Sequence, residues 1–367
     1  MQRSIRTAAL ALATTLVLAA GCAAGVSLPS GVVYPSITLD KTVTDDLTVN
    51  HSFTFEGKQQ DVTVSVDGSL YAGAQQAPKS VVRFGDSRKT DWICDYYPAF
   101  VFDPAQDGFF SDLIGQMRRI RDAEKLDSDR YVELMTVFVQ SLEYRTDPGD
   151  LSPKFPVETF VQRAGDCDDK TLLLGGMLAR EGYDVAVLLF DTEQHVALGI
   201  RADALAYGDT GYALIETTAP GFVGMVPAHV GDGTRLSTDP QTFALGDGET
   251  TYTSAHQVAW IVDTVADLET RAAALAEKIA AADSELTVLE ERARRLQREL
   301  DARASDPARY NALLPEYNAA VERYNTALAA RNALVERYNA AVEAIDYVAA
   351  HLDDRPGVAA YLHTHAS

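Results

Sequence analysis

The most constraining feature of this sequence is an apolar pattern at helical spacing in its C-terminal third. From Val265 onward, apolar residues follow one another at steps of three and four, which places them on one face of a helix as the seam of a coiled coil. These residues are Leu268, Ala272, Leu275, Ile279, Ala282, Leu286, Leu289, Ala293, Leu296 and Leu300. The segment is therefore expected to form one long helix.

A second long helix is expected after the interruption "ARASDPAR", with Ser305 or Asp306 as its cap and Pro307 in its first turn. It carries a seven-residue repeat, "YNALLPE", "YNAAVER", "YNTALAA", "RNALVER" and "YNAAVEA". A short loop between two periodic helices predicts an antiparallel hairpin over 255–352, with arms of about 60 Å, and a tail over 353–367. The hairpin could be a spacer, a dimerisation arm or a substrate-recognition arm, or it could pack only on itself.

The N-terminus has the pattern of a signal peptide over 1–22. Arg3 and Arg6 precede "TAALALATTLVLAAG", which is too short for a stable membrane span. The stretch "LVLAAGCAAG" resembles a lipoprotein processing box, although Ala19 stands where leucine is commoner. The resemblance implies a lipid on Cys22 and a place in the cell envelope. An ordinary secretory signal is the alternative, and it also predicts an extracytoplasmic protein.

Composition narrows the class of protein. Hydrophobic residues make up 47% of the chain, so it is globular, and the net charge of −21 belongs to its surface. No basic, aromatic-interleaved stretch offsets this charge, which argues against a nucleic-acid partner. The chain has 3 cysteines. With Cys22 lipidated, Cys94 and Cys167 could form one disulfide at most, and Cys94, among aromatic residues, is predicted to be a small buried side chain.

The middle of the chain divides into two regions. Residues 23–104 are predicted to be a linker and a β-rich region, because apolar and polar residues alternate and turn signals occur at Glu56-Gly57 and Asp67-Gly68. Residues 105–250 change to helical spacing in "SDLIGQMRRIRDAEKL" and "SDRYVELMTVFVQSLEY". They are expected to form the catalytic region.

The stretch "GDCDDKTLLLGGMLAREGYDV" predicts a buried helix that begins at Cys167. Asp168 and Asp169 suit its first turn, and the following residues are apolar on nearly every face. Three strand-like runs come next, "DVAVLLF", "HVALGI" and "GYALIETT". The N-terminus of a helix favours a thiolate, but the two aspartates oppose it, so Cys167 needs a nearby cation.

A histidine on the predicted strands meets that need, and a glutamate there could orient it and stabilise its imidazolium. His195 opens the second run and Glu216 lies in the third. A nucleophilic thiol, an imidazole base and a carboxylate that orients the base form a catalytic triad.

Cysteine, histidine and acid in this order, with the "GDCDDK" block, resemble the transglutaminase-like superfamily, and most closely its extracytoplasmic cysteine proteinases and their archaeal relatives. The similarity covers about 131–227 of the chain. It implies an α+β protein with a papain-like core, in which Cys167 is the nucleophile, His195 the general base and Glu216 the third member. It also places Gln140 where relatives carry a donor to an oxyanion.

The sequence departs from the family at two points. The third member is usually aspartate rather than Glu216, and Val196 and Ala197 stand where many relatives have an aromatic residue. Other interpretations remain open: an inert buried Cys167, or a fold that has lost its activity. The residue-level alternatives are a zinc site of Cys167, His195 and Glu216, a calcium loop of Asp166, Asp168 and Asp169, His229 as the base, and Asp203 or Asp209 as the acid.

The predicted function is that of a secreted or lipid-anchored cysteine protease or acyl transferase acting on protein or peptide amides, without a cofactor or metal. The alternative is a non-catalytic cell-surface binding or scaffold module that uses this fold and the hairpin. Expected partners are a protein or peptide substrate, the membrane through the lipid, and a coiled-coil partner or a second copy of the chain. The sequence leaves open the substrate and the choice between water and an amine.

Overall fold

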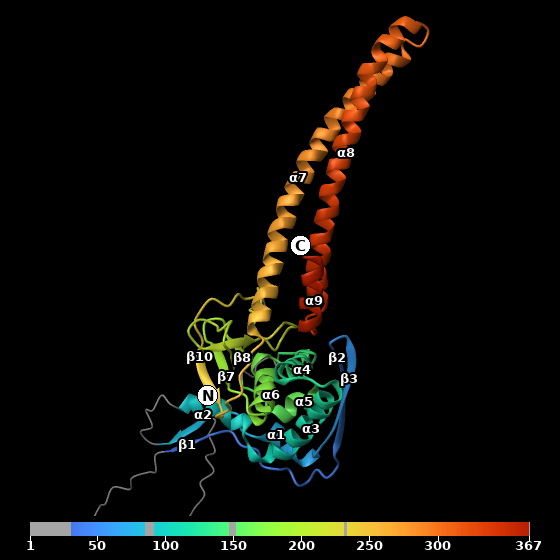
Figure 1. The fold of residues 1–367 in the computed structure, drawn as a ribbon. Coiled ribbons are helices and arrows are strands. Elements are labelled where there is room, and N and C mark those ends of the chain that lie inside the picture. The colour runs from blue at the N-terminus through green and yellow to red at the C-terminus, as the bar shows by residue number, and fades with distance from the viewer. Residues whose placement is uncertain (1–30, 85–91, 147–151, 231–232, 367) are drawn as a thin grey trace, which may run out of the picture.

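A computed structural model of the chain describes residues 31–84, 92–146, 152–230 and 233–366. A region of mixed helix and sheet carries a pair of long C-terminal helices that project from it (Figure 1). The expected combination of helix and sheet with a C-terminal helical pair is confirmed.

The three apolar runs that the sequence predicts as strands form one antiparallel sheet. They are β7 (Val185–Phe190), β8 (His195–Arg201) and β9 (Tyr212–Ile215), and β10 (Gln241–Leu245) completes the order β10-β7-β8-β9. Alternate side chains face opposite sides of the sheet. Thus Leu198 joins the main core, whereas Ala197 joins a smaller cluster with Val230 and Leu236.

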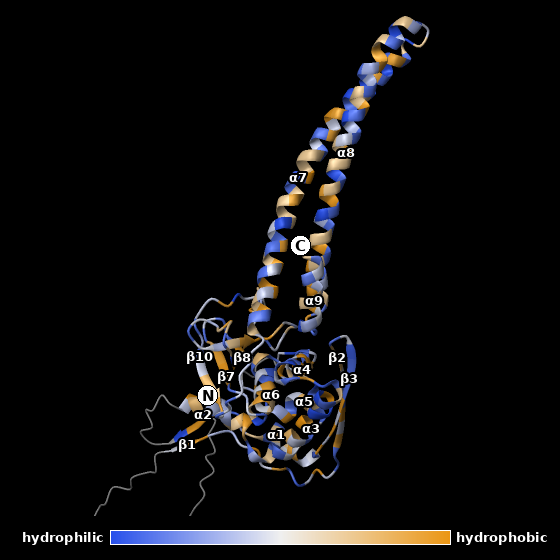
Figure 2. Ribbon diagram, viewed as in Figure 1, coloured by the Kyte–Doolittle hydropathy of each residue, from blue (hydrophilic) through white to orange (hydrophobic). Residues whose placement is uncertain are grey.

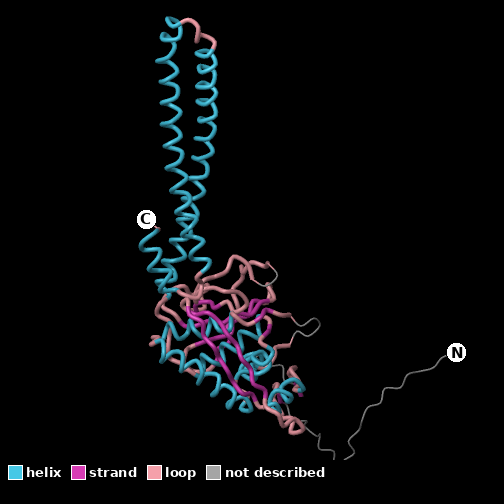
Figure 3. Tube along the Cα trace, turned by 90° about the vertical axis from the view of Figure 1, so that its right-hand side faces the viewer, coloured by secondary structure: helices cyan, strands magenta, loops and turns pink. Residues whose placement is uncertain are grey.

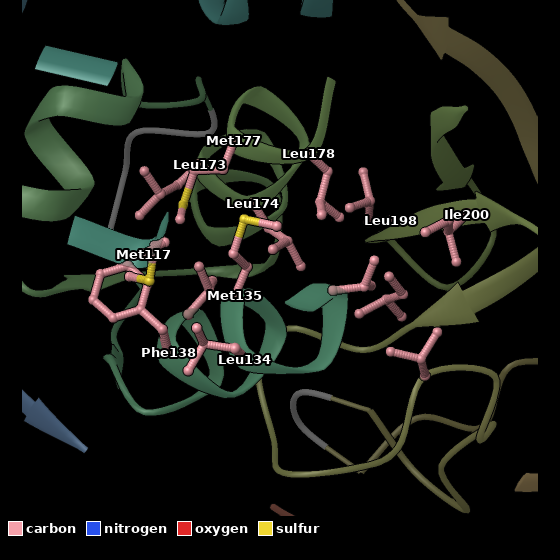
Figure 4. Close-up of a cluster of buried hydrophobic side chains, with 14 of the residues drawn as sticks. Met117, Leu134, Met135, Phe138, Leu173, Leu174, Met177, Leu178, Leu198 and Ile200 are labelled. Atoms are coloured by element: carbon pink, nitrogen blue, oxygen red, sulfur yellow. The ribbon is translucent and has the colours of Figure 1, made fainter. Parts of the chain in front are cut away.

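The main core is built around α6 (Cys167–Arg180), the helix predicted from "GDCDDKTLLLGGML". It packs against β7 and β8 on one side and against α4 (Ser128–Gln140) and α5 (Pro156–Gln162) on the other. Figure 4 shows leucines and methionines of α6 facing those of α4, with Leu198 and Ile200 of β8 to one side. Packing is close: a Cβ at Gly176 would lie 2.5 Å from Phe110 Cζ on α3 (Asp107–Glu124). The prediction of a central, buried helix is confirmed.

The N-terminal region contains less sheet than its alternating pattern predicts. Strands β2 (Leu47–Phe55) and β3 (Lys58–Val66) form a hairpin whose turn, Glu56-Gly57, has positive φ at both residues, as a two-residue hairpin requires. The second turn signal, Asp67-Gly68, instead begins α1 (Gly68–Gln76), because the Asp67 side chain accepts from Ser69 N. The remaining elements are β1 (Gly31–Val33), which pairs with β4 (Val82–Phe84), then α2 (Trp92–Val101), the 3₁₀ turn η1 (Pro104–Gln106), and β5 (Glu143–Tyr144), which pairs with β6 (Ala164–Gly165).

Helix α2 also corrects the prediction for Cys94, which is exposed rather than buried. The buried residues of α2 are Tyr97, Phe100 and Val101 in its C-terminal half, whereas Cys94 lies in its first turn, where no residue is buried. Cys94 and Cys167 are both free thiols, so they form no disulfide with each other.

The C-terminal helices α7 (Ala255–Asp301) and α8 (Pro307–Ala350) form the expected hairpin, and Figure 3 shows it in a view turned by 90°. At 47 residues, α7 is about 70 Å long. Its seam is buried at six of the predicted positions: Leu268, Ala272, Leu275, Leu286, Leu296 and Leu300. Orange and blue alternate along both helices in Figure 2, as a narrow apolar seam requires. Among the described helices, none is apolar enough over a sufficient length to cross a membrane.

The segment predicted as a tail over 353–367 is helical for most of its length, because Arg355–His365 forms helix α9. The Asp354 side chain accepts from Gly357 N and caps this helix, and Pro356 stands in its first turn. Figure 1 shows α9 beside the lower part of the hairpin.

Candidate active site

Cys167 is the first residue of α6 and is partly buried. Asp166 caps the helix and accepts from Asp169 N, with 3.5 Å between donor and acceptor, while Asp166 N donates to Asp169 Oδ2 at 3.3 Å. This reciprocal capping fixes the backbone at the cysteine. Gly165 is required beside it, because a Cβ there would lie 2.6 Å from Asp169 Cβ.

His195 and Glu216 form a buried pair at one end of the sheet. Strands β8 and β9 are antiparallel with Leu198 opposite Ile215, so the start of β8 and the end of β9 lie at the same edge. His195 Nε2 lies 2.8 Å from Glu216 Oε2, and the two residues are 3% and 4% exposed. His195 and Glu216 are therefore in contact, and the longer glutamate side chain reaches the imidazole.

Thr218 holds the other oxygen of Glu216. Its backbone N–H and its hydroxyl both donate to Oε1, at 2.7 and 2.5 Å. Burial opposes ionisation of the Glu216 carboxyl, but the hydrogen bonds from His195 and Thr218 outweigh it, so the pKa lies below its ordinary value. Glu216 is thus a carboxylate with a fixed orientation. Thr218 is not among the residues predicted from the sequence. Its position two residues after Glu216 was the signal that could have indicated it.

Cys167 contacts the backbone of β8 next to this pair. The N–H of Val196, the residue after His195, donates to the Cys167 sulfur and favours its thiolate. Burial and, next, the negative charge of Asp168 raise the pKa of the Cys167 thiol to about 12. The resting sulfur is therefore protonated, and ionisation requires transfer of the proton to a base.

The aspartates after the cysteine differ in their environment. Lys154 donates to Asp169 twice, from its backbone N at 2.6 Å and from Nζ at 2.7 Å. Burial raises the pKa of Asp169 to about 6 despite this pairing. Burial and a hydrogen bond to Asp166 raise the pKa of Asp168 well above its ordinary value, so Asp168 holds its proton more strongly than a carboxyl in water does.

Among the described residues, one group of acidic, histidine or cysteine side chains brings its ligand atoms within 4.8 Å of one another, namely Asp166, Asp168 and Asp169. The hydrogen bonds just described already occupy two of these carboxylates. The structure does not bring Cys167, His195 and Glu216 together as such a group.

Gln140, the predicted oxyanion donor, has other partners. Its Nε2 donates to the backbone carbonyls of Glu216 and Gly221, at 2.8 and 3.0 Å, and its Oε1 accepts from Gly221 N at 3.4 Å. Both amide hydrogens are thus engaged. In this geometry Gln140 holds the turn that follows Glu216 and offers no free donor to an oxyanion.

The remaining predicted alternatives lie apart from the pair. His229 is exposed, and Asp203 lies 3.6 Å from His256 in a surface pair, with 56% of its side chain exposed. Cys22 lies outside the described residues.

Two further side chains lie near the site. Tyr97 on α2 is buried, and burial, followed by the charges of Asp168 and Cys167, raises the pKa of its hydroxyl. Lys170 on α6 is fully buried beneath the site. Lys170 is not among the site residues predicted from the sequence. Its position three residues after Cys167, within the "GDCDDK" block, was the signal that could have indicated it.

Comparisons with family models, with curated proteins and with solved structures found no match for this chain.

Proposed function

We propose that this chain is an extracytoplasmic cysteine hydrolase of the transglutaminase-like type, with a papain-like core that cleaves protein or peptide amides. The buried His195–Glu216 pair, beside a cysteine at the start of a helix, is the observation that carries the proposal. An imidazole buried with a carboxylate is poised to accept a proton, and the protonated Cys167 supplies one.

The chemistry follows from the order of the contacts. Because Glu216 engages Nε2 of His195, Nδ1 is the ring nitrogen left to take the thiol proton. The Cys167 sulfur then attacks the amide carbonyl and forms a tetrahedral adduct. His195 returns the proton to the departing amine as the C–N bond breaks, which leaves an acyl-enzyme. Water releases the acid by hydrolysis, and an amine would release a new amide. We favour water.

Stabilisation of the oxyanion is assigned to the first turn of α6. Backbone N–H groups in the first turn of a helix have no partner within the helix, and those at Cys167 lie beside the sulfur that attacks. Gln140 supports the site indirectly, since it fixes the backbone of Glu216.

The alternative is a binding or scaffold module without catalysis. It is favoured by the high thiol pKa of Cys167, which burial and Asp168 cause, and by the long projecting hairpin. In that case Cys167 would remain a thiol at neutral pH and His195 would have no effect on its reactivity.

Alkylation of Cys167 tests the proposal directly. Because Cys94 is exposed, the experiment uses Cys22→Ser/Cys94→Ser protein, in which Cys167 is the only one of the 3 cysteines. We expect iodoacetamide to modify the native protein at neutral pH, and His195→Ala to slow the reaction at least about tenfold. Hydrolysis of fluorescein-labelled casein should disappear in Cys167→Ala. A Cys167 that reacts only after unfolding would overturn the proposal.

A further inference from the structure

Lys170 is a buried cation without a carboxylate partner. It is 0% exposed, and its Nζ donates to two backbone carbonyls, Leu142 O at 3.0 Å and Gln140 O at 3.3 Å. Within the described parts of the chain, Nζ forms no ion pair. The other two buried or nearly buried lysines differ, because Lys79 pairs with Glu158 and Lys154 with Asp169.

Such a group is costly for a purely structural role. Burial of an ammonium group has a large desolvation cost, which hydrogen bonds to neutral carbonyls do not offset as a carboxylate would. A methionine of similar length would fill the same space at Lys170 without the desolvation. The charge itself therefore calls for an explanation.

The contacts of Lys170 lead to the catalytic acid. Lys170 binds the end of α4 at Gln140, and the side chain of Gln140 binds the backbone of Glu216 and of Gly221. Glu216 in turn holds His195. A continuous series of hydrogen bonds thus connects a residue one turn along the helix from the nucleophile to the base.

We infer that Lys170 is a positioning residue that fixes the acid of the triad through Gln140 and supplies the positive charge that balances the ionised site. The inference rests on the proposed function. When Cys167 has passed its proton to His195, the thiolate and the Glu216 carboxylate carry two negative charges against one imidazolium. The Lys170 ammonium brings the charge of these four groups to zero in a buried region, where an unbalanced charge is expensive.

The electrostatics of Lys170 agree with this role. Burial lowers the pKa of its ammonium to about 8, and the negative charge of Glu216 opposes that change, so the two groups interact. Other titratable groups lie near the site, on α6 and on segments around it. They are Asp166, Asp168 and Asp169 on α6, Lys154 before α5, Tyr97 on α2, and His51 on β2, which contacts Ser141 at 2.7 Å.

The test compares Lys170→Met with Lys170→Gln in the background where Cys167 is the only thiol. Methionine removes the charge and the donors, whereas glutamine keeps a donor for the carbonyls. Without the cation, both the thiol and the imidazolium hold their protons more strongly. The pH profile of Cys167 alkylation should therefore move about one unit toward higher pH in both variants. At pH 7 alkylation should slow about tenfold, and more in Lys170→Met than in Lys170→Gln.

Lys79→Met is the matched control, because it removes a nearly buried lysine that pairs with Glu158. It should lower the melting temperature and leave the pH profile in place. A folded Lys170→Met protein with the parent's pH profile of alkylation would overturn the inference. If the methionine variant does not fold, a parent-like pH profile in Lys170→Gln would overturn it instead. His195→Ala distinguishes failure of the proposed function from failure of the inference about Lys170. If it leaves alkylation unchanged, the proposed function fails and the inference with it; if alkylation depends on His195 but not on Lys170, the inference alone fails.

Discussion

The side-chain amide of Gln140 donates to the backbone carbonyl of Glu216, with 2.8 Å between Nε2 and the oxygen. The contact joins the last residue of α4 to the first residue after β9, and a second bond from the same amide reaches the Gly221 carbonyl. Gln140 thereby closes the turn that carries the Glu216 carboxylate. A role in positioning and a role in oxyanion binding predict different results.

Replacement of Gln140 by methionine should reveal which role it has. The change leaves two buried carbonyls without a donor, so the free energy of unfolding should fall by about 1–3 kcal/mol for each. Alkylation of Cys167 should slow as well, because Glu216 loses its support. Iodoacetamide forms no oxyanion, so a variant with normal stability and alkylation but reduced turnover would instead support the oxyanion donor that the sequence predicts. Denaturant titration and alkylation rates provide the comparison.

Glu216→Gln tests the charge of the third member of the proposed triad. Glutamine keeps the size of the side chain and one acceptor for Thr218, but it removes the charge that stabilises the imidazolium of His195. Turnover should fall by about two to four orders of magnitude while the fold persists. The apparent pKa of Cys167 should shift in parallel, since thiol and imidazole titrate as a pair. Parent-level turnover and alkylation would make Glu216 a bystander.

The sequence predicted α6 and strands β7, β8 and β9 because each pattern lies within a short stretch of chain. It also predicted the pair of His195 and Glu216, because the antiparallel order of those strands brings their polar ends to one edge. The partners of Gln140 could not be predicted in this way. They lie 76 and 81 residues further along the chain, and only tertiary packing brings them to α4.

The exposure of Cys94 and the presence of helix α9 were not predicted from the sequence. Cys94 lies among aromatic residues in the sequence, but only the C-terminal half of α2 is buried, and Cys94 lies in its exposed first turn. Helix α9 is short and opens with Arg355, Pro356 and Gly357, so it has no long apolar period. It packs through tertiary contacts, which include buried Val358 and Leu362 and the stacked rings of Tyr347 and Tyr361 at 3.6 Å between centroids.

A buried ion pair at the base of the hairpin should make stability depend on pH. Arg355 Nε lies 2.5 Å from Glu133 Oε1, and the Tyr252 hydroxyl donates to the same oxygen at 2.6 Å. Burial raises the pKa of Glu133 from 4.5 to about 7 in the folded protein, even though Arg355 opposes the shift. The folded state therefore binds a proton that the unfolded state has released, and stability falls as pH rises from 4.5 to about 7.

Glu133→Gln should remove this part of the pH dependence. Denaturant titrations at several pH values between about 4.5 and 7 measure it, and the variant's curve should be flatter than the parent's. Arg355→Met is the companion change. It leaves Glu133 buried without its cation, so the loss of stability should grow with pH. Parallel curves for parent and Glu133→Gln would contradict the assignment.

The proposed lipid anchor can be tested without reference to the described residues. If Cys22 carries a lipid, mature protein should partition into the detergent phase of a Triton X-114 separation, and Cys22→Ser should release it or block processing. Ala19→Leu is a matched change that keeps a processing box. Detergent partitioning that Cys22→Ser leaves unaltered would remove the anchor and favour an ordinary secretory signal.

The hairpin should fold without the rest of the chain. Its two arms bury their own seam, so a fragment from Ser254 to Asp353 should be strongly helical by circular dichroism. A longer fragment that ends at Ala366 should melt at a higher temperature, because α9 adds two stacked contacts. These are Tyr361 on Tyr347 and His363 on Trp260, with the second pair at 4.2 Å between centroids. Tyr361→Ala in the longer fragment should lower its melting temperature toward that of the shorter one. If both fragments remain unfolded at high concentration, the arms depend on the globular region, and the ion pair of Arg355 with Glu133 would be the first contact to examine.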